Sequence, residues 1–126
     1  MGALPMKCRQ YLANREIIYE QVDINSQKAI VIRGFKLPLG QFDAATGDIL
    51  ILLPAGYPDS APDMFYVSPW LRLATNSLYP RAADQPFDFN GTNWQRWSRH
   101  NNEWRPGIDG IWTTIKRIET ALEVAS

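Results

Sequence analysis

The order of apolar and polar positions divides the chain into two helices and four strands. Residues 6–14 form a short predicted helix, since Pro5 is tolerated in a first turn and Asn14 suits a helix end. The predicted strands, recognised by β-branched and apolar runs between turn signals, are residues 17–24, 28–35, 48–53 and 64–67. Residues 48–53 are apolar on both faces, which predicts a strand in the middle of a sheet. Because the strands follow one another through short connections, they predict a four-stranded antiparallel meander.

A second helix is predicted near the C-terminus, over residues 110–124. Its apolar residues recur at steps of four, three and four, which places on one face Ile111, Ile115, Ile118 and Leu122. Asp109 precedes the helix and is the predicted N-cap, where a carboxylate also suits the positive helix end. The stripe predicts a helix that packs against the sheet.

Between the last strand and this helix, residues 68–105 follow no period and contain Pro69, Pro80 and Pro86. A loop of this length in a compact domain is uncommon and is often functional. The predicted fold class is therefore α+β: an N-terminal helix, a four-stranded antiparallel meander, a long loop and a C-terminal helix. At 126 residues the chain is expected to form one domain, residues 1–126.

Composition narrows the classes of function. Thirteen basic residues balance thirteen acidic ones, so no overall field attracts nucleic acid or an anionic membrane. The longest apolar run, residues 49–54, is too short to span a bilayer, and the N-terminus lacks the order of a signal peptide. One cysteine, Cys8, cannot form an intramolecular disulfide. We therefore expect a cytoplasmic protein with neither nucleic acid nor a membrane as its partner.

Tryptophans and arginines between residues 94 and 105 are the one feature that suits nucleic acid. Such residues can stack on a single strand and neutralise its phosphates. The segment contains no lysine, however, and the whole chain is neutral. We expect Trp94, Trp97 and Trp104 to anchor the loop to the rest of the domain instead.

Two groups of residues carry a resemblance to a known family. One is the turn Gly56-Tyr57-Pro58 with Pro62 after it; the other is residues 94–100 (Trp-Gln-Arg-Trp-Ser-Arg-His) together with 104–107 (Trp-Arg-Pro-Gly). Together with the predicted order of helices and strands, these motifs resemble the ubiquitin-conjugating (UBC-like) superfamily, and most closely its prokaryotic family E. The resemblance implies a UBC-like fold whose long loop holds the active site, in a bacterial ubiquitin-like conjugation pathway. It also implies three partners: an activating enzyme, a ubiquitin-like protein and a target protein.

The sequence departs from that family where the chemistry takes place. The second proline of the usual Tyr-Pro-x-x-Pro-Pro is Ala61, and the His-Pro-Asn motif is absent. Counted back from Trp104, the nucleophilic cysteine of the family would lie near residues 96–98, where the chain has no thiol. Cys8 lies far upstream, and we interpret it as a small apolar residue that is buried or half-buried. The resemblance therefore implies a carrier without an active-site cysteine.

Ser98 and His100 are the candidates for the missing chemistry. In an extended segment, side chains two residues apart point the same way, so the imidazole can take the proton of the hydroxyl. Arg96, Arg99 and Asn101 are candidates for stabilising the negative charge that develops on the acyl oxygen. We hypothesise that Ser98 carries the ubiquitin-like C-terminus as an oxyester, with His100 as base, and passes it to a target amine. This is the activity of an acyl-carrier transferase.

Three alternatives remain open. His100 could itself accept the acyl group or act on the incoming amine. Ser98 could instead be a turn residue and His100 a hydrogen-bonded structural histidine. The chain could then be a non-catalytic UBC-like module that binds a ubiquitin-like protein or an activating enzyme. No cofactor and no metal is expected, since the sequence has neither a glycine-rich phosphate loop nor metal-ligand spacing.

Overall fold

The computed structural model describes residues 4–100 and 103–126 as two helices and six strands. Along the chain these are α1 (Met6–Asn14), β1 (Tyr19–Ile24), β2 (Gln27–Lys36), β3 (Thr46–Leu53), β4 (Phe65–Ser68), β5 (Gln85–Phe89), β6 (Thr92–Trp97) and α2 (Ile111–Glu123). The predicted helices and the four predicted strands are all present, with ends shifted by no more than two residues. Neither described helix has the length and apolar composition needed to cross a membrane.

The strands form one antiparallel sheet in the order β1-β2-β3-β4-β6-β5. β3 lies inside the sheet, as its two apolar faces predict: Ile49 and Ile51 join the main core, and Leu50 joins a cluster on the other face. β1 to β4 pair in sequence, but the prediction of four strands is wrong in number. Within the described residues the sheet continues past β4 with β6 and then β5.

The two additional strands lie in the segment that the sequence predicted to be irregular. They are joined by Asn90 and Gly91, whose φ angles of 49° and 82° are those that a two-residue hairpin turn requires. The Asn-Gly pair was therefore the signal that could have revealed the hairpin. Pro86 lies in β5 at the edge of the sheet, where a strand needs partners on one side only and tolerates proline.

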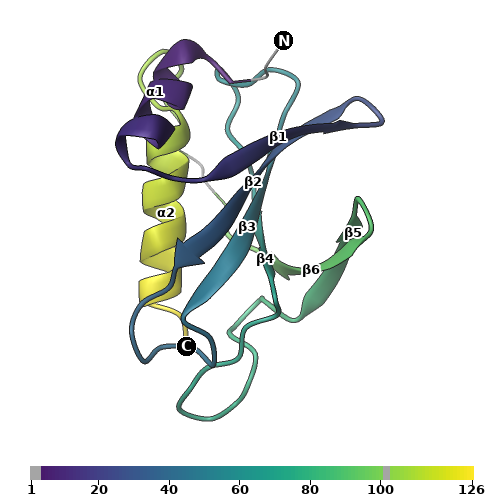
Figure 1. Cartoon of the computed structure of the whole chain (residues 1–126), viewed down its shortest axis with the longest axis vertical. Coiled ribbons are helices and arrows are strands. Elements are labelled where there is room, and N and C mark those ends of the chain that lie inside the picture. Colours follow the sequence, from purple (N-terminus) through teal and green to yellow (C-terminus); the bar gives the residue numbers. More distant parts are fainter. Residues whose placement is uncertain (1–3, 101–102) are drawn as a thin grey trace.

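Both helices cover the same face of the sheet (Figure 1). The apolar stripe predicted for α2 is buried there in full: Ile111, Ile115, Ile118 and Leu122. On the opposite face a smaller cluster consists of Ala29, Val31, Leu50, Tyr66 and Trp94. The β5–β6 hairpin projects to this side, and its Phe87 and Phe89 pack against the cluster. The hairpin therefore shields apolar surface that no helix covers.

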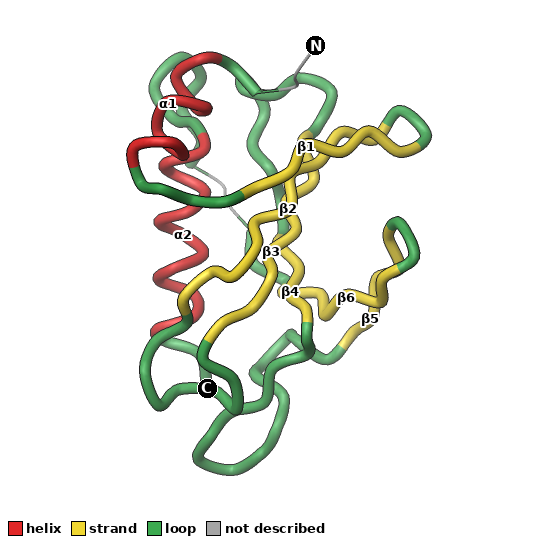
Figure 2. The backbone as a smooth tube through the Cα atoms, viewed as in Figure 1, coloured by secondary structure: helices red, strands yellow, loops and turns green. Residues whose placement is uncertain are grey.

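One buried side chain, Gln95, fastens the loop of residues 69–84 to the sheet. Figure 2 shows this loop as a long irregular segment below the strands. Oε1 of Gln95 accepts the backbone N–H of Leu71 (2.9 Å), and Nε2 donates to the carbonyl oxygens of Leu71 (3.0 Å) and Ala83 (2.8 Å). The indole N–H of Trp97 donates to the same Oε1 at 3.1 Å. The loop is thus tied to β6, the strand that leads to the predicted site.

Helix α2 begins at Ile111, one residue later than predicted. Gly110, and not Asp109, is the N-cap residue. A Cβ atom at position 110 would lie 2.6 Å from the ring of Trp112, so any side chain there would require that ring to move. Asp109 contributes to the start of the helix in another way, described below.

Candidate active site

Ser98 follows β6 directly, and its backbone is held by the loop of residues 69–84. Its N–H donates to the carbonyl oxygen of Ala82 at 3.0 Å. Gln95, three residues earlier, bonds to Ala83 in the same loop. Ser98 as a whole is half-buried.

Ser98, His100 and Asp63 form a chain of polar contacts, here called the polar triad. Nε2 of His100 lies 3.3 Å from Oγ of Ser98, and Nδ1 of His100 lies 2.8 Å from Oδ1 of Asp63. The side chains of His100 and Asp63 are 56% and 63% exposed. A carboxylate on one ring nitrogen and a hydroxyl on the other is the arrangement in which imidazole takes up the hydroxyl proton.

Asp63 was not among the predicted site residues, because strand pairing alone brings it there. β4 and β6 pair antiparallel with Phe65 opposite Trp97. Asp63 lies two residues before Phe65 and His100 three residues after Trp97, so the pairing places both just beyond the same end of the strand pair. Finding this neighbour from the sequence requires β6, a strand that the sequence pattern did not reveal.

Arg99, a predicted site residue, lies beside the polar triad. It donates to the carbonyl oxygen of Ser98 (3.1 Å), and its guanidinium carbon lies 5.0 Å from the ring centre of Trp97. Partial burial, together with the nearby charge of Arg81, lowers the pKa of Arg99. An arginine keeps its charge even so, which leaves a cation beside the backbone carbonyl of Ser98.

No hydrogen bond or ion pair within the described residues joins Arg96 to the polar triad. Arg96 lies opposite Tyr66 in the β4–β6 pair, and Tyr66 belongs to the cluster on the sheet face away from the helices. Its Nε is buried and has no hydrogen-bond partner among the described residues. Asn101, the remaining predicted residue, lies outside the described residues.

A groove of about 490 Å³ lies between α2 and the polar triad. Asp63, His100 and Arg99 line it together with residues of α2. Its apolar lining consists of Pro62, Met64, Phe65, Ile118, Ala121 and Val124. Lys116 and Arg117 add two exposed cationic side chains. The groove is therefore mainly apolar with cationic side chains around it, and of the polar triad His100 and Asp63 line it.

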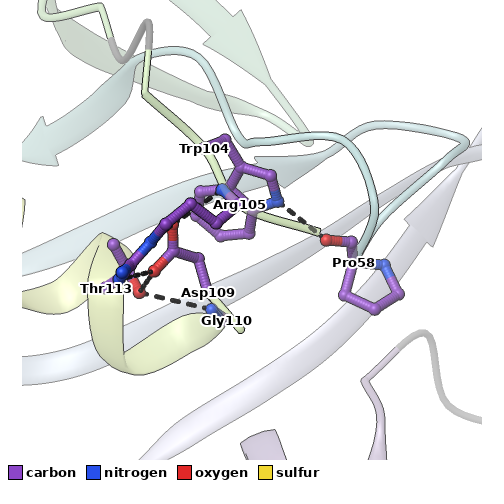
Figure 3. Close-up of polar contacts among 6 residues, drawn as sticks. All are labelled: Pro58, Trp104, Arg105, Asp109, Gly110 and Thr113. Carbon is purple, nitrogen blue, oxygen red and sulfur yellow. Dashed lines mark hydrogen bonds and ion pairs between the residues drawn. The ribbon is translucent and has the colours of Figure 1, made fainter. Parts of the chain in front are cut away.

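Trp104 ties the segment that follows the site to the Tyr57-Pro58 turn (Figure 3). Its indole N–H donates to the carbonyl oxygen of Pro58 at 2.8 Å, and its ring centre lies 6.4 Å from that of Tyr57. Trp94 and Trp97 are buried in the sheet. Trp104 therefore anchors its segment as predicted, whereas Trp94 and Trp97 belong to strand β6 and not to a loop.

Asp109 fixes the entry to α2. Its carboxylate accepts the N–H of Arg105 (2.8 Å), the guanidinium of the same residue (2.9 Å) and the hydroxyl of Thr113 (3.0 Å) (Figure 3). The side chain of Asp109 is only 3% exposed. The side-chain and backbone hydrogen bonds from Arg105 hold the pKa of Asp109 at about 2, below its usual range. The turn before the helix is therefore locked by one carboxylate.

Cys8 lies in the core, on the buried side of α1. It is 1% exposed, and its Sγ lies 3.2 Å from the hydroxyl of Tyr57. Burial, and to a lesser degree this contact, raises the pKa of Tyr57. Such a thiol has the setting of a structural residue. Nor does it join a metal site: in residues 4–100 and 103–126, no group of three histidine, cysteine, aspartate or glutamate side chains could hold a metal ion.

Comparison with known families agrees with the resemblance seen in the turn and tryptophan motifs. The family model described as prokaryotic E2 family E matches residues 4–125, which include both helices, the whole sheet and the polar triad. No curated protein and no solved structure gives a significant match. The chain therefore belongs to prokaryotic E2 family E and is an E2-like protein.

Proposed function

We propose that this protein is an acyl carrier of a bacterial ubiquitin-like conjugation pathway, and that Ser98 holds the ubiquitin-like C-terminus as an oxyester. The observation that carries the proposal is the contact of 3.3 Å between Oγ of Ser98 and Nε2 of His100. Family membership supplies the type of pathway, with an activating enzyme, a ubiquitin-like protein and a target protein as partners. The only thiol of the chain is buried in the core, where it is not placed to accept the acyl group.

The transfer takes two steps at one atom. In the first, Oγ of Ser98 attacks the activated acyl carbon, the bond to the donor breaks, and His100 takes the hydroxyl proton. In the second, a target amine attacks the ester carbon, the bond to Oγ breaks, and the proton returns to Ser98. The amine loses its own proton to His100 or to solvent, so the products are an amide and the free serine.

The surroundings of Ser98 suit this chemistry. Arg99 lies beside it and carries the positive charge needed to stabilise the tetrahedral oxyanion. The apolar groove is lined by His100 and Asp63, next to Ser98, and offers a site for an extended acyl segment. The side chain of His100 is exposed, so an incoming amine can reach it from solvent.

Reconstitution with purified activating enzyme, ubiquitin-like protein and ATP tests the proposal. We expect a covalent adduct that resists thiols, is cleaved by mild alkali and is absent from Ser98→Ala. Ser68→Ala, at a half-buried serine at the end of β4, is the matched control and keeps the adduct. An adduct retained in Ser98→Ala, or one lost to thiols, would contradict the proposal.

The competing function is a non-catalytic module that binds a ubiquitin-like protein or an activating enzyme. The absence of a thiol next to the site favours it, since hydroxyls are weaker nucleophiles. The same experiment separates the two, because a binding module gives a measurable complex and no covalent adduct.

A further inference from the structure

We propose that the polar triad gives this protein a second activity, the hydrolysis of small activated carboxylic esters without any partner protein. The activity follows from three side chains of this one chain: Ser98 as nucleophile, His100 as base and Asp63 as a positioning residue. It goes beyond the carrier function, because water replaces the target amine and no ubiquitin-like protein is needed.

Asp63 sets the state of the imidazole. With its carboxylate 2.8 Å from Nδ1, the neutral ring keeps its proton on that nitrogen and donates it to Asp63. The lone pair of Nε2 then faces Oγ of Ser98 at 3.3 Å. In the opposite tautomer, Nε2 would carry the proton and would therefore be unable to take the proton of the Ser98 hydroxyl. Asp63 therefore acts through His100 and does not touch the reacting atoms.

The site admits both an ester and water. The groove reaches His100, whose ring contacts Ser98, and it offers a short acyl chain an apolar wall that includes Met64, Phe65 and Ile118. Arg99 lines the same groove and places a cation near the developing oxyanion. The side chains of His100 and Asp63 are 56% and 63% exposed, so solvent reaches the base that would activate a water molecule. A large ligand is not required to complete the site.

The reaction balances in two steps. Oγ of Ser98 bonds to the ester carbonyl carbon, its proton passes to His100, and the bond to the leaving alcohol breaks as that group takes up a proton. Water then attacks the acyl-serine carbon and gives a proton to His100. The bond to Oγ breaks, Ser98 regains its proton, and a carboxylic acid leaves. The net change is one ester and one water converted to one acid and one alcohol.

The test uses the purified chain alone with 4-nitrophenyl acetate. We expect release of nitrophenol above the buffer rate, with an acetyl group mapped by mass spectrometry to Ser98. Ser98→Ala should lose the acetylation and the excess rate. Asp63→Asn should lower kcat about tenfold or more with little change in KM. The fall in kcat should be smaller than in a buried triad, because the carboxylate of Asp63 is solvated. Asp59→Asn, at a neighbouring exposed aspartate, serves as the control and leaves kcat unchanged.

A spectroscopic readout separates positioning from a merely structural role. His100 is the only histidine, so 15N-labelled histidine reports one ring. We expect wild type to show the Nδ1-protonated tautomer, Asp63→Asn to lose that preference, and Asp63→Glu to restore it with part of kcat. Wild-type hydrolysis at the buffer rate, full activity in Ser98→Ala, or equal kcat in Asp63→Asn and wild type would overturn the proposal. Ester hydrolysis without transfer from an activating enzyme would reject the carrier function alone.

Discussion

Nδ1 of His100 lies 2.8 Å from a carboxylate oxygen of Asp63, a residue 37 positions earlier in the chain. The contact exists because β4 and β6 are neighbours in the sheet and the two residues lie just beyond their paired ends. The chemistry at Ser98 thus depends on a pairing between strands that a long loop separates. Changes in that loop should therefore affect activity as well as stability.

Loss of the base should slow ester formation without unfolding the protein. His100→Ala removes the group that takes the Ser98 proton, and the rate of adduct formation should fall by roughly 10²–10⁴-fold. The residue is exposed, so the melting temperature should stay close to that of wild type. Single-turnover transfer and thermal melting check the two statements. An unchanged transfer rate would remove His100 from the mechanism.

Gln95 should be the most sensitive polar position for stability. In wild type the Gln95 side chain bonds to the peptide groups of Leu71, the carbonyl of Ala83 and the indole N–H of Trp97. Gln95→Ala removes these hydrogen bonds and leaves the groups without this partner. The free energy of unfolding should fall by about 2–4 kcal/mol. Urea denaturation measures it, with the exposed Gln85→Ala on β5 as a control that changes little. Equal midpoints for the two variants would contradict this account of the loop.

Asp109 should make the stability of the folded protein decrease at acidic pH. Its pKa in the folded protein is about 2, against an ordinary value of 3.8, so the folded state favours the ionised form. This contribution is complete above the ordinary pKa and is lost as the pH falls through the lower one. The difference in melting temperature between wild type and Asp109→Asn should therefore be constant above about pH 5 and shrink toward pH 2. A difference that does not change with pH would show that the Arg105 contact is not the cause.

Cys8 should be dispensable for transfer. It is buried against Tyr57, and a serine hydroxyl can keep the contact with the phenol oxygen. Cys8→Ser should therefore form the covalent adduct at the wild-type rate, measured by intact mass after reconstitution. Loss of the adduct in a folded Cys8→Ser protein would transfer the acceptor role to the thiol.

Local patterns predicted most of the fold, and only part of the site. Helix α2 and strand β3 are buried, and burial leaves an apolar pattern in the sequence. The pattern is a periodic stripe for α2 and a continuous apolar run for β3. The β5–β6 hairpin has no such period, because Thr92 and Asn93 are exposed and Pro86 interrupts the edge strand. Ser98 and His100 are neighbours in sequence and were found together. The pairing of β4 with β6 brings Asp63 to Ser98 and His100, so Asp63 could be recognised only from the structure.

The most direct test of Ser98 as the acyl acceptor exchanges its oxygen for sulfur. In a Cys8→Ser background, Ser98→Cys places the only thiol of the chain at the proposed site. After reconstitution with activating enzyme, ubiquitin-like protein and ATP, the adduct of this variant should be cleaved by thiols, whereas the Cys8→Ser parent adduct should resist them. A Ser98→Cys adduct that still resists thiols, or none in a folded protein that binds its partner, would place the acceptor elsewhere.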